Sequence, residues 1–245
     1  MKKLSFLFVF VAVYSYSTLT QAQDFDVPPG SVMRMVNCKI IDDRFDFNDV
    51  VERARILDFD ENAPNIVFFR RPIYATPEYH ESWDMQIAAY YPSYTEMVDR
   101  RVASGDNSYG RLPISCSSPF VARNVIINPT DSQLEDQTAM LTRFCTLNQG
   151  ASFRSAYNRM RTATENFASA GNSSMTQMWT PGLGGTRNAD FDFVLAVVGP
   201  NRSELTERLD MIRNGFRPVP AENSSAFSCD RPSMWATSRI YQASN

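Results

Sequence analysis

Histidine is nearly absent from this chain, because His80 is the only one among 245 residues. A metal site built from several histidines is therefore excluded, and no spaced motif of carboxylates takes its place. Catalysis by a Ser/His/Asp triad would have to use His80, and the sequence contains no GxSxG motif to carry the nucleophile. We therefore predict no metal and no cofactor, and no motif identifies a catalytic residue.

No apolar run is long enough to cross a membrane as a helix. The most pronounced run, from Leu4 to Tyr14, is shorter than the roughly 20 residues that a spanning helix needs. It follows Lys2 and Lys3 and precedes a polar stretch that ends at Ala22, an order typical of a signal peptide. We predict that residues 1–22 are a signal peptide. The protein would then be soluble, without a membrane anchor, and exported to a periplasmic or extracellular compartment.

Lysine is also scarce, since Lys39 is the only one left once the predicted signal peptide is removed. The loss of Lys2 and Lys3 changes the formal charge from −3 to −5. An acidic chain without a basic stripe is poorly suited to nucleic acid, so we predict no nucleic-acid partner. The other cations are arginines. They either form ordinary salt bridges with the interspersed acidic residues or recognise carboxylates and phosphates by bidentate contact.

The most informative feature that is present is an internal repeat. The segment 84–100, DMQIAAYYPSYTEMVDR, returns 108 positions later as DFVLAVVGPNRSELTER at 192–208, with five identical residues. A repeat on this scale indicates a duplicated small domain rather than a solenoid unit. We therefore predict a first repeat at 23–125 and a second at 126–245.

The four cysteines are distributed two to each repeat. Cys38 and Cys145 lie in the opening strand-like segments, and Cys116 and Cys229 lie in the closing segments, each three residues before a proline. An exported chain with four cysteines is expected to form two disulfides, for which three pairings are possible. The repeat favours the pairings Cys38 with Cys116 and Cys145 with Cys229. A redox or metal site is disfavoured because no CxxC motif occurs.

Each repeat reads as strand, helix, strand, strand, helix, strand. Apolar residues at helical spacing predict one helix that begins at Phe47 and another that begins at Phe153, 106 positions later. Further helices are expected after Ser93 and Asn201. The expected strands are 32–41, 66–69, 83–90 and 114–122 in the first repeat, and a segment around Cys145, 175–179, 191–198 and 234–240 in the second.

Repeated carboxylates stand at two places in each half. Glu96 and Glu204 look like a catalytic pair, but each follows a typical N-cap residue at the spacing of a capping box, so we predict that both cap helices. These helices are expected to end near Gly105 and Gly215, a residue type that tolerates a left-handed C-cap. Asp84 and Asp192 each begin a mainly apolar strand. They are either strand-end turn or salt-bridge residues or, alternatively, catalytic carboxylates.

The order βαββαβ is that of the ferredoxin-like unit, whose antiparallel sheet has the strand order 4-1-3-2. Two such units, with sequences such as DFDFVLAVVGPNRSELTERL in the third strand and second helix, resemble the dimeric α/β-barrel superfamily. The resemblance implies an α+β fold in which two four-stranded antiparallel sheets close into a barrel. Because both sheets would belong to one chain, a monomer would suffice to close it.

The superfamily includes cofactor-independent monooxygenases, isomerases, heme enzymes and members without an assigned activity, so the function has to be read from the site. A heme member is expected to use a proximal histidine, for which the sequence offers only His80. A solvated loop histidine is the alternative interpretation of this residue.

The two repeats differ most clearly in the connection between their second and third strands. This connection is aromatic and ionisable in the first repeat and rich in glycine in the second. A duplicated fold can keep a pocket in one half while the other half serves as scaffold, so we predict that the first connection contacts a ligand. The alternative is an exposed loop with aromatic packing. The ligand-binding candidates are Tyr74, Tyr79, His80, Trp83 and Asp84.

Two functions remain open at this point. The first is an exported protein that binds a small, largely apolar or aromatic molecule in a cleft of the barrel. The second is a cofactor-independent monooxygenase or isomerase in which a Tyr, His or Asp near the first-half loop polarises the substrate. The absence of a recognisable catalytic constellation favours the first.

Overall fold

The computed structural model describes residues 26–75, 82–104, 109–184, 190–219 and 226–244. The first half contains β1 (Ser31–Ile40), α1 (Phe47–Arg55), β2 (Ile66–Tyr74), β3 (Met85–Tyr91), α3 (Tyr94–Ser104), β4 (Ile114–Cys116) and β5 (Phe120–Ile127). The second half contains β6 (Gln137–Leu147), α4 (Phe153–Ser169), β7 (Met175–Pro181), β8 (Phe193–Val198), α5 (Arg202–Arg213), β9 (Phe227–Cys229) and β10 (Ser233–Gln242).

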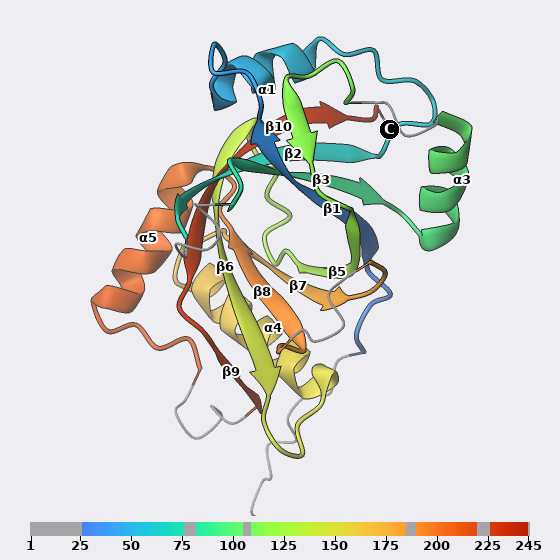
Figure 1. Cartoon of the computed structure of the whole chain (residues 1–245). Coiled ribbons are helices and arrows are strands. Elements are labelled where there is room, and N and C mark those ends of the chain that lie inside the picture. Colours follow the sequence, from blue (N-terminus) through green and yellow to red (C-terminus); the bar gives the residue numbers. More distant parts are fainter. Residues whose placement is uncertain (1–25, 76–81, 105–108, 185–189, 220–225, 245) are drawn as a thin grey trace, which may run out of the picture.

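The long strands form a closed antiparallel barrel of eight strands (Figure 1). Around the barrel they follow the order β10, β2, β3, β1, β5, β7, β8 and β6, and β6 pairs with β10 to complete the ring. The pairs β5 with β7 and β10 with β2 join the two halves. The α+β class and the closed barrel implied by the sequence are thus confirmed, and the barrel closes within one chain.

The closing segment of each half differs from the single strand that the sequence predicts. In the first half the expected strand 114–122 is broken into β4, which pairs beside β1, and β5, which continues past Pro119. In the second half the short strand β9 pairs with β6 before β10 begins. Proline has no N–H to donate to a strand ladder, which explains the break at Pro119.

Both disulfides bridge the short closing strand of a half to its opening strand. Cys38 bonds to Cys116 and Cys145 bonds to Cys229, the pairings that the repeat favours. Within each pair the two cysteines stand directly opposite each other in an antiparallel ladder. Antiparallel neighbours bring Cα atoms close enough for a disulfide, and here the Cα atoms of each pair are 4.0 Å apart.

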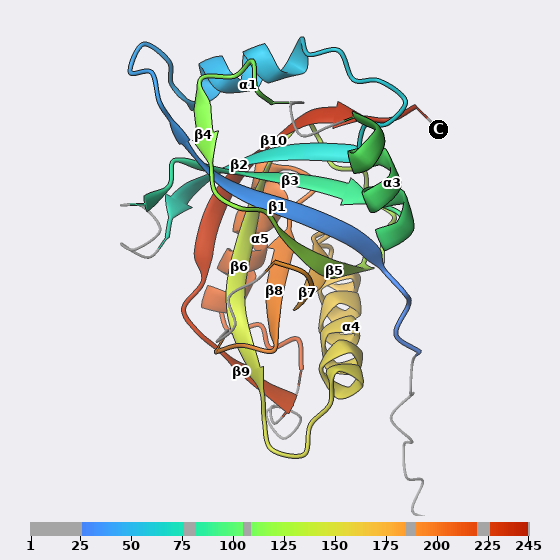
Figure 2. The same cartoon turned by 45° about the vertical axis from the view of Figure 1, so that its right-hand side comes forward.

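Helices cover the outside of the barrel. In Figure 2, α1 and α3 lie over the strands of the first half, and α4 lies beside those of the second. Side chains alternate across each strand. On β1, for example, Met33 and Met35 join a cluster inside the barrel, whereas Val32 and Val36 join a cluster under the first-half helices. Among the described residues no helix combines the length and apolar composition needed to cross a bilayer.

The predicted capping boxes at Glu96 and Glu204 are only half correct. The side chains of Ser93 and Asn201 accept from the backbone N–H groups of Glu96 and Glu204, as a cap requires. The glutamate side chains do not reach back, however. Glu96 pairs with Arg100 on the same helix, and Glu204 accepts from the N–H of residue 173. For a glutamate side chain, a hydrogen bond to a charged or buried partner is stronger than one to a solvated backbone N–H. Complete capping boxes instead begin α1 and α4.

Asp84 and Asp192 have the same structural role in the two halves. The carboxylate of Asp84 accepts from the N–H of Ile40 at 2.8 Å, and that of Asp192 accepts from the N–H of Leu147 at 2.7 Å. Their own N–H groups donate to the carbonyls of Cys38 and Cys145. Each aspartate therefore forms hydrogen bonds with backbone groups at the end of an opening strand. This supports the strand-end interpretation over the catalytic one.

Candidate functional site

The structure brings together only part of the predicted ligand-contacting loop. Tyr79 and His80 lie outside the described residues. Tyr74 is the last residue of β2 and is 71% exposed. Trp83 and Asp84 both line an open depression of about 410 Å³ near the end of β1, whereas Tyr74 does not.

The depression at Trp83 and Asp84 is acidic, but the carboxylates of Asp42 and Asp84, two of the three that line it, already have partners. Asp84 accepts from the backbone of Ile40. Arg44 donates to Asp42 and lowers the pKa of that carboxyl to about 2. Over the described part of the chain, no group of His, Cys, Asp and Glu side chains is arranged to hold a metal ion. Because it is open and two of its carboxylates are engaged, this depression is a weaker candidate for a ligand site.

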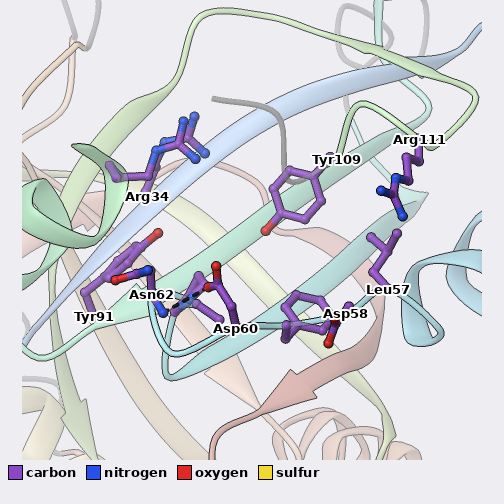
Figure 3. Close-up of a pocket in the computed structure, with 12 residues that line it drawn as sticks. Arg34, Leu57, Asp58, Asp60, Asn62, Tyr91, Tyr109 and Arg111 are labelled. Carbon is purple, nitrogen blue, oxygen red and sulfur yellow. Dashed lines mark hydrogen bonds between the residues drawn. The ribbon is translucent and has the colours of Figure 1, made fainter. Parts of the chain in front are cut away.

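A more enclosed cavity of about 380 Å³ lies on the helix-covered side of the first-half sheet. Its walls come from β1, β3, the α1–β2 connection, α3 and the segment after α3. Figure 3 shows Arg34, Tyr91 and Tyr109 around one space, with the connection that carries Asp60 and Asn62 on its other side. Arg101 and Arg111 also line the cavity, and Leu57 and Phe59 supply apolar surface.

The cavity lies where the two halves differ in the length of their first helix. Helix α1 has 9 residues and is followed by an irregular connection, whereas α4 has 17 residues and runs almost to β7. The added turns of α4 carry Ala163, Thr164 and Phe167, which are all buried. In the second half, helical side chains thus occupy the space beside the sheet. In the first half a loop surrounds it and leaves it open.

Hydrogen bonds fix the loop that forms the cavity wall. The side chain of Asp60 accepts from the N–H of Asn62 at 2.9 Å, which is the dashed contact in Figure 3. Arg100 donates to the carbonyl of Ala63 and to the side chain of Asn65, both at 2.8 Å. These bonds tie the loop to its own backbone at one point and to α3 at another.

Arg34 is the cation at the sheet side of the cavity. It lies between Val32 and Val36 on β1, which both belong to the core, and it is half-buried. Burial lowers the pKa of Arg34, and the nearby positive charge of Arg101 lowers it further. No carboxylate of the described residues pairs with Arg34. The cavity therefore contains a partly desolvated positive charge for which the described residues provide no carboxylate counter-ion.

Tyr91 and Tyr109 add neutral hydrogen-bond donors to this charge. Burial raises the pKa of Tyr91, and burial together with the nearby Tyr91 raises the pKa of Tyr109. Both phenols are thus protonated at neutral pH, when each can donate one hydrogen bond. Guanidinium and hydroxyl donors that face one cavity are suited to holding the oxygens of an anion.

An alkaline titration tests these environments. A tyrosine whose pKa is raised by folding stabilises the protein fully below its unfolded pKa of about 10, and this contribution is lost as the pH rises above that value. Wild type is expected to show a group of late-ionising tyrosines in the absorbance at 295 nm. Replacement of Tyr91 and Tyr109 by Phe should reduce that group. A reduction instead in the component that ionises near pH 10 would contradict the assignment.

A second buried arginine, Arg70, lies inside the barrel and has a different role. It is 2% exposed, donates to Tyr90 and to the side chain of Gln86, and lies 5.0 Å from the ring of Trp179. Neutral acceptors and the aromatic face thus contact the two terminal nitrogens and the guanidinium plane, while the buried Nε has no hydrogen-bond partner among the described residues. Arg70 therefore belongs to the polar packing of the barrel interior.

The sequence did not point to this cavity, because its three arginines come from β1, α3 and the connection after α3. One signal was nevertheless present. Arg34 interrupts an apolar face of β1, and the residue at the same distance before the cysteine in the other half is Leu141. This contrast between the two halves marks the open cavity better than the loop between the second and third strands.

No protein-family model matches the sequence, and none of the curated proteins matches it. The chain is similar to the solved structure of a mutant chlorite dismutase from Candidatus Nitrospira defluvii. The TM-score is 0.50 and the identity 9%, over 87% of this chain and 93% of that one. A heme-binding protein from Thermus thermophilus gives a TM-score of 0.48 at 8% identity, covering 85% and 91%. At such identities the similarity to the chlorite dismutase concerns the fold alone.

Proposed function

We propose that this protein binds a small molecule whose acidic group is held in the first-half cavity. The observation that carries the proposal is Arg34, a half-buried guanidinium that faces the cavity and has no carboxylate partner among the described residues. A desolvated charge without a counter-ion is costly, and a bound anion removes that cost. The cavity volume of about 380 Å³ lies within the usual range for small-molecule sites.

The apolar and aromatic lining of the cavity indicates the chemical character of the rest of the ligand. Leu57 and Phe59 line the cavity, and Phe59 is held by stacking on Tyr241 with ring centroids 4.3 Å apart. The rings of Tyr91 and Tyr109 add aromatic surface. The apolar or aromatic ligand expected from the sequence is therefore revised to an aromatic or apolar body that carries an anionic group.

The lining of the first-half cavity does not suit heme iron. Protein ligands of heme iron are His, Cys thiolate, Met or Tyr. Of these, only Tyr91 and Tyr109 line the cavity, and their raised pKa values disfavour the phenolate. The ligand proposed for this cavity is therefore not heme.

The alternative function, a cofactor-independent monooxygenase or isomerase, receives less support. Such an enzyme would need a base or polarising group at the substrate. The tyrosines of the cavity have raised pKa values and Asp84 is bonded to the backbone. These observations favour binding over catalysis.

We also propose that the protein is exported and that its chain arose by duplication. Residues 1–22 would be a signal peptide, and 23–125 and 126–245 would be repeats of one ancestral unit. The equivalent disulfides and the equivalent roles of Asp84 and Asp192 support the duplication. Disulfides persist in oxidising compartments, which supports a periplasmic or extracellular location. Closure of the barrel within one chain supports a monomer.

Calorimetric titration with two probes, benzoate and phenyl phosphate, tests the binding site. Wild type is expected to bind at least one of them, and Arg34→Gln should weaken that binding about 30-fold or more, because a partly buried charge loses its partner. Arg44→Gln is the matched control. Its side chain is 79% exposed and lies outside the cavity, so affinity should be unchanged.

Two results would reject the binding site. One is the absence of measurable binding of either probe to wild-type protein. The other is equal affinity in wild type and the Arg34→Gln variant. Native mass spectrometry of the protein purified from its host gives an independent readout, since a retained acidic molecule should be lost in Arg34→Gln and kept in Arg44→Gln.

A further inference from the structure

The end of the chain, which belongs to the second half, contacts the loop that forms one wall of the first-half cavity. Strand β10 pairs with β2 as far as Gln242, which lies opposite Ile66. Just beyond the strand, the N–H of Ala243 donates to the carbonyl of Asn65 at 2.8 Å. The side chain of Asn65 also accepts from Arg100. The α1–β2 loop is therefore tied to α3 on one side and to the C-terminal segment on the other.

Tyr241 is the side chain of β10 that reaches this loop. Its ring stacks on the ring of Phe59 with centroids 4.3 Å apart and an interplanar angle of 16°. Both side chains are half-buried and pack against the core cluster of the first half. Phe59 lines the cavity, whereas Tyr241 does not. Tyr241 therefore acts on a ligand through the ring of Phe59 and not by direct contact.

The stack holds the ring of Phe59 in one orientation. Phe59 lies outside any helix or strand, so no regular backbone ladder orients its side chain. A ring that is held before binding loses little rotamer freedom when a ligand arrives. Because Tyr241 covers one face of this ring, a ligand in the cavity meets the other face or the edge. Aromatic bodies gain from both contacts, since aromatic rings prefer offset-stacked or edge-to-face arrangements.

We infer that Tyr241 is a positioning residue that makes the first-half cavity selective for flat aromatic acids. This inference rests on the proposed binding function and adds a determinant of specificity to it. Arg34 holds the anionic group, and the stacked pair of Phe59 and Tyr241 discriminates among organic bodies. The site is then a product of both halves, because Tyr241 belongs to the last strand of the second half.

Two matched pairs of probes test this role by calorimetric titration. Benzoate is compared with cyclohexanecarboxylate, and phenyl phosphate with cyclohexyl phosphate. Within each pair the charge is the same and only the first member has a flat ring. Wild type is expected to prefer the flat member of at least one pair about fivefold, as an added aromatic contact would provide. Tyr241→Leu keeps apolar bulk but removes the stack, so this preference should disappear. Phe59→Leu should abolish it as well.

The ratio of the two affinities separates positioning from a general structural defect, because a distorted cavity weakens both members of a pair alike. Tyr241→Phe keeps the stack and should keep the preference. Phe144→Leu is the control, since Phe144 forms its aromatic pair with Phe191 in the second half, outside the cavity. The assignment is overturned if wild type prefers neither flat probe, or if Tyr241→Leu or Phe59→Leu retains the preference. Failure of all four probes to bind wild type would instead overturn the proposed function.

Discussion

Replacing Cys145 and Cys229 together by Ala is expected to lower the free energy of unfolding by about 4 to 5 kcal/mol. The disulfide closes a loop with a sequence separation of 84 and so restricts the unfolded chain strongly. Removal of the bond gives the unfolded state more conformations, while β6 and β9 in the folded state lose little packing. Urea denaturation followed by circular dichroism and fluorescence measures the difference.

The first disulfide provides the matched comparison. Cys38 and Cys116 are 78 residues apart, so the chain-entropy term for their loop is nearly the same. The Cys38→Ala, Cys116→Ala variant should therefore show a similar loss. Non-reducing peptide mapping must link Cys38 to Cys116 and Cys145 to Cys229. A peptide that links Cys38 to Cys145 would contradict both the pairing and the division into halves.

The fold was predictable because its main signals are local or repeated. The helix at Phe47 follows from apolar spacing, and the pairing of Cys38 with Cys116 follows from their equivalent places in the two halves. Strand interruptions were harder to predict. The short strands β4 and β9 depend on where the opening strand ends and the neighbouring half begins, which is information about tertiary structure.

The glutamates show where local rules fail. Ser93 and Asn201 accept from the backbone as N-caps, because a short side chain has few other partners within reach. The side chains of Glu96 and Glu204 are longer and reach more distant partners. Glu96 accepts from Arg100, and Glu204 accepts from the backbone N–H of Ser173. The sequence spacing was the same in both halves, yet the outcome depended on what packs nearby.

The candidate site could not be predicted from sequence motifs, because a cavity depends on how distant elements pack and not on a local pattern of residues. It results from the short helix α1 and from the loop that Arg100 holds open. Its charged lining is assembled from residues as distant in sequence as Arg34 and Arg111. Because these residues are far apart in the sequence, no local sequence pattern identifies the cluster. A position-by-position comparison of the two halves would have shown that the first half has Arg34 where the second half has Leu141.

Replacing Phe167 by Ala should destabilise the protein by about 3 to 5 kcal/mol, the usual cost of truncating a buried phenylalanine. Phe167 is 1% exposed and lies on the part of α4 that has no equivalent in α1. Its ring contacts Phe216 at 5.0 Å between centroids and lies 3.9 Å from the guanidinium of Arg208. Urea denaturation measures the loss.

Phe144→Ala is the control, because that side chain is 50% exposed on β6 and its truncation leaves no enclosed cavity. Its cost should be well below that of Phe167→Ala. Part of the difference would come from Arg208, whose pKa is lowered to about 10 by burial and which would lose its aromatic face. If the two variants were equally stable, the end of α4 would not fill the second half. The length of the first helix would then not explain the cavity in the first half.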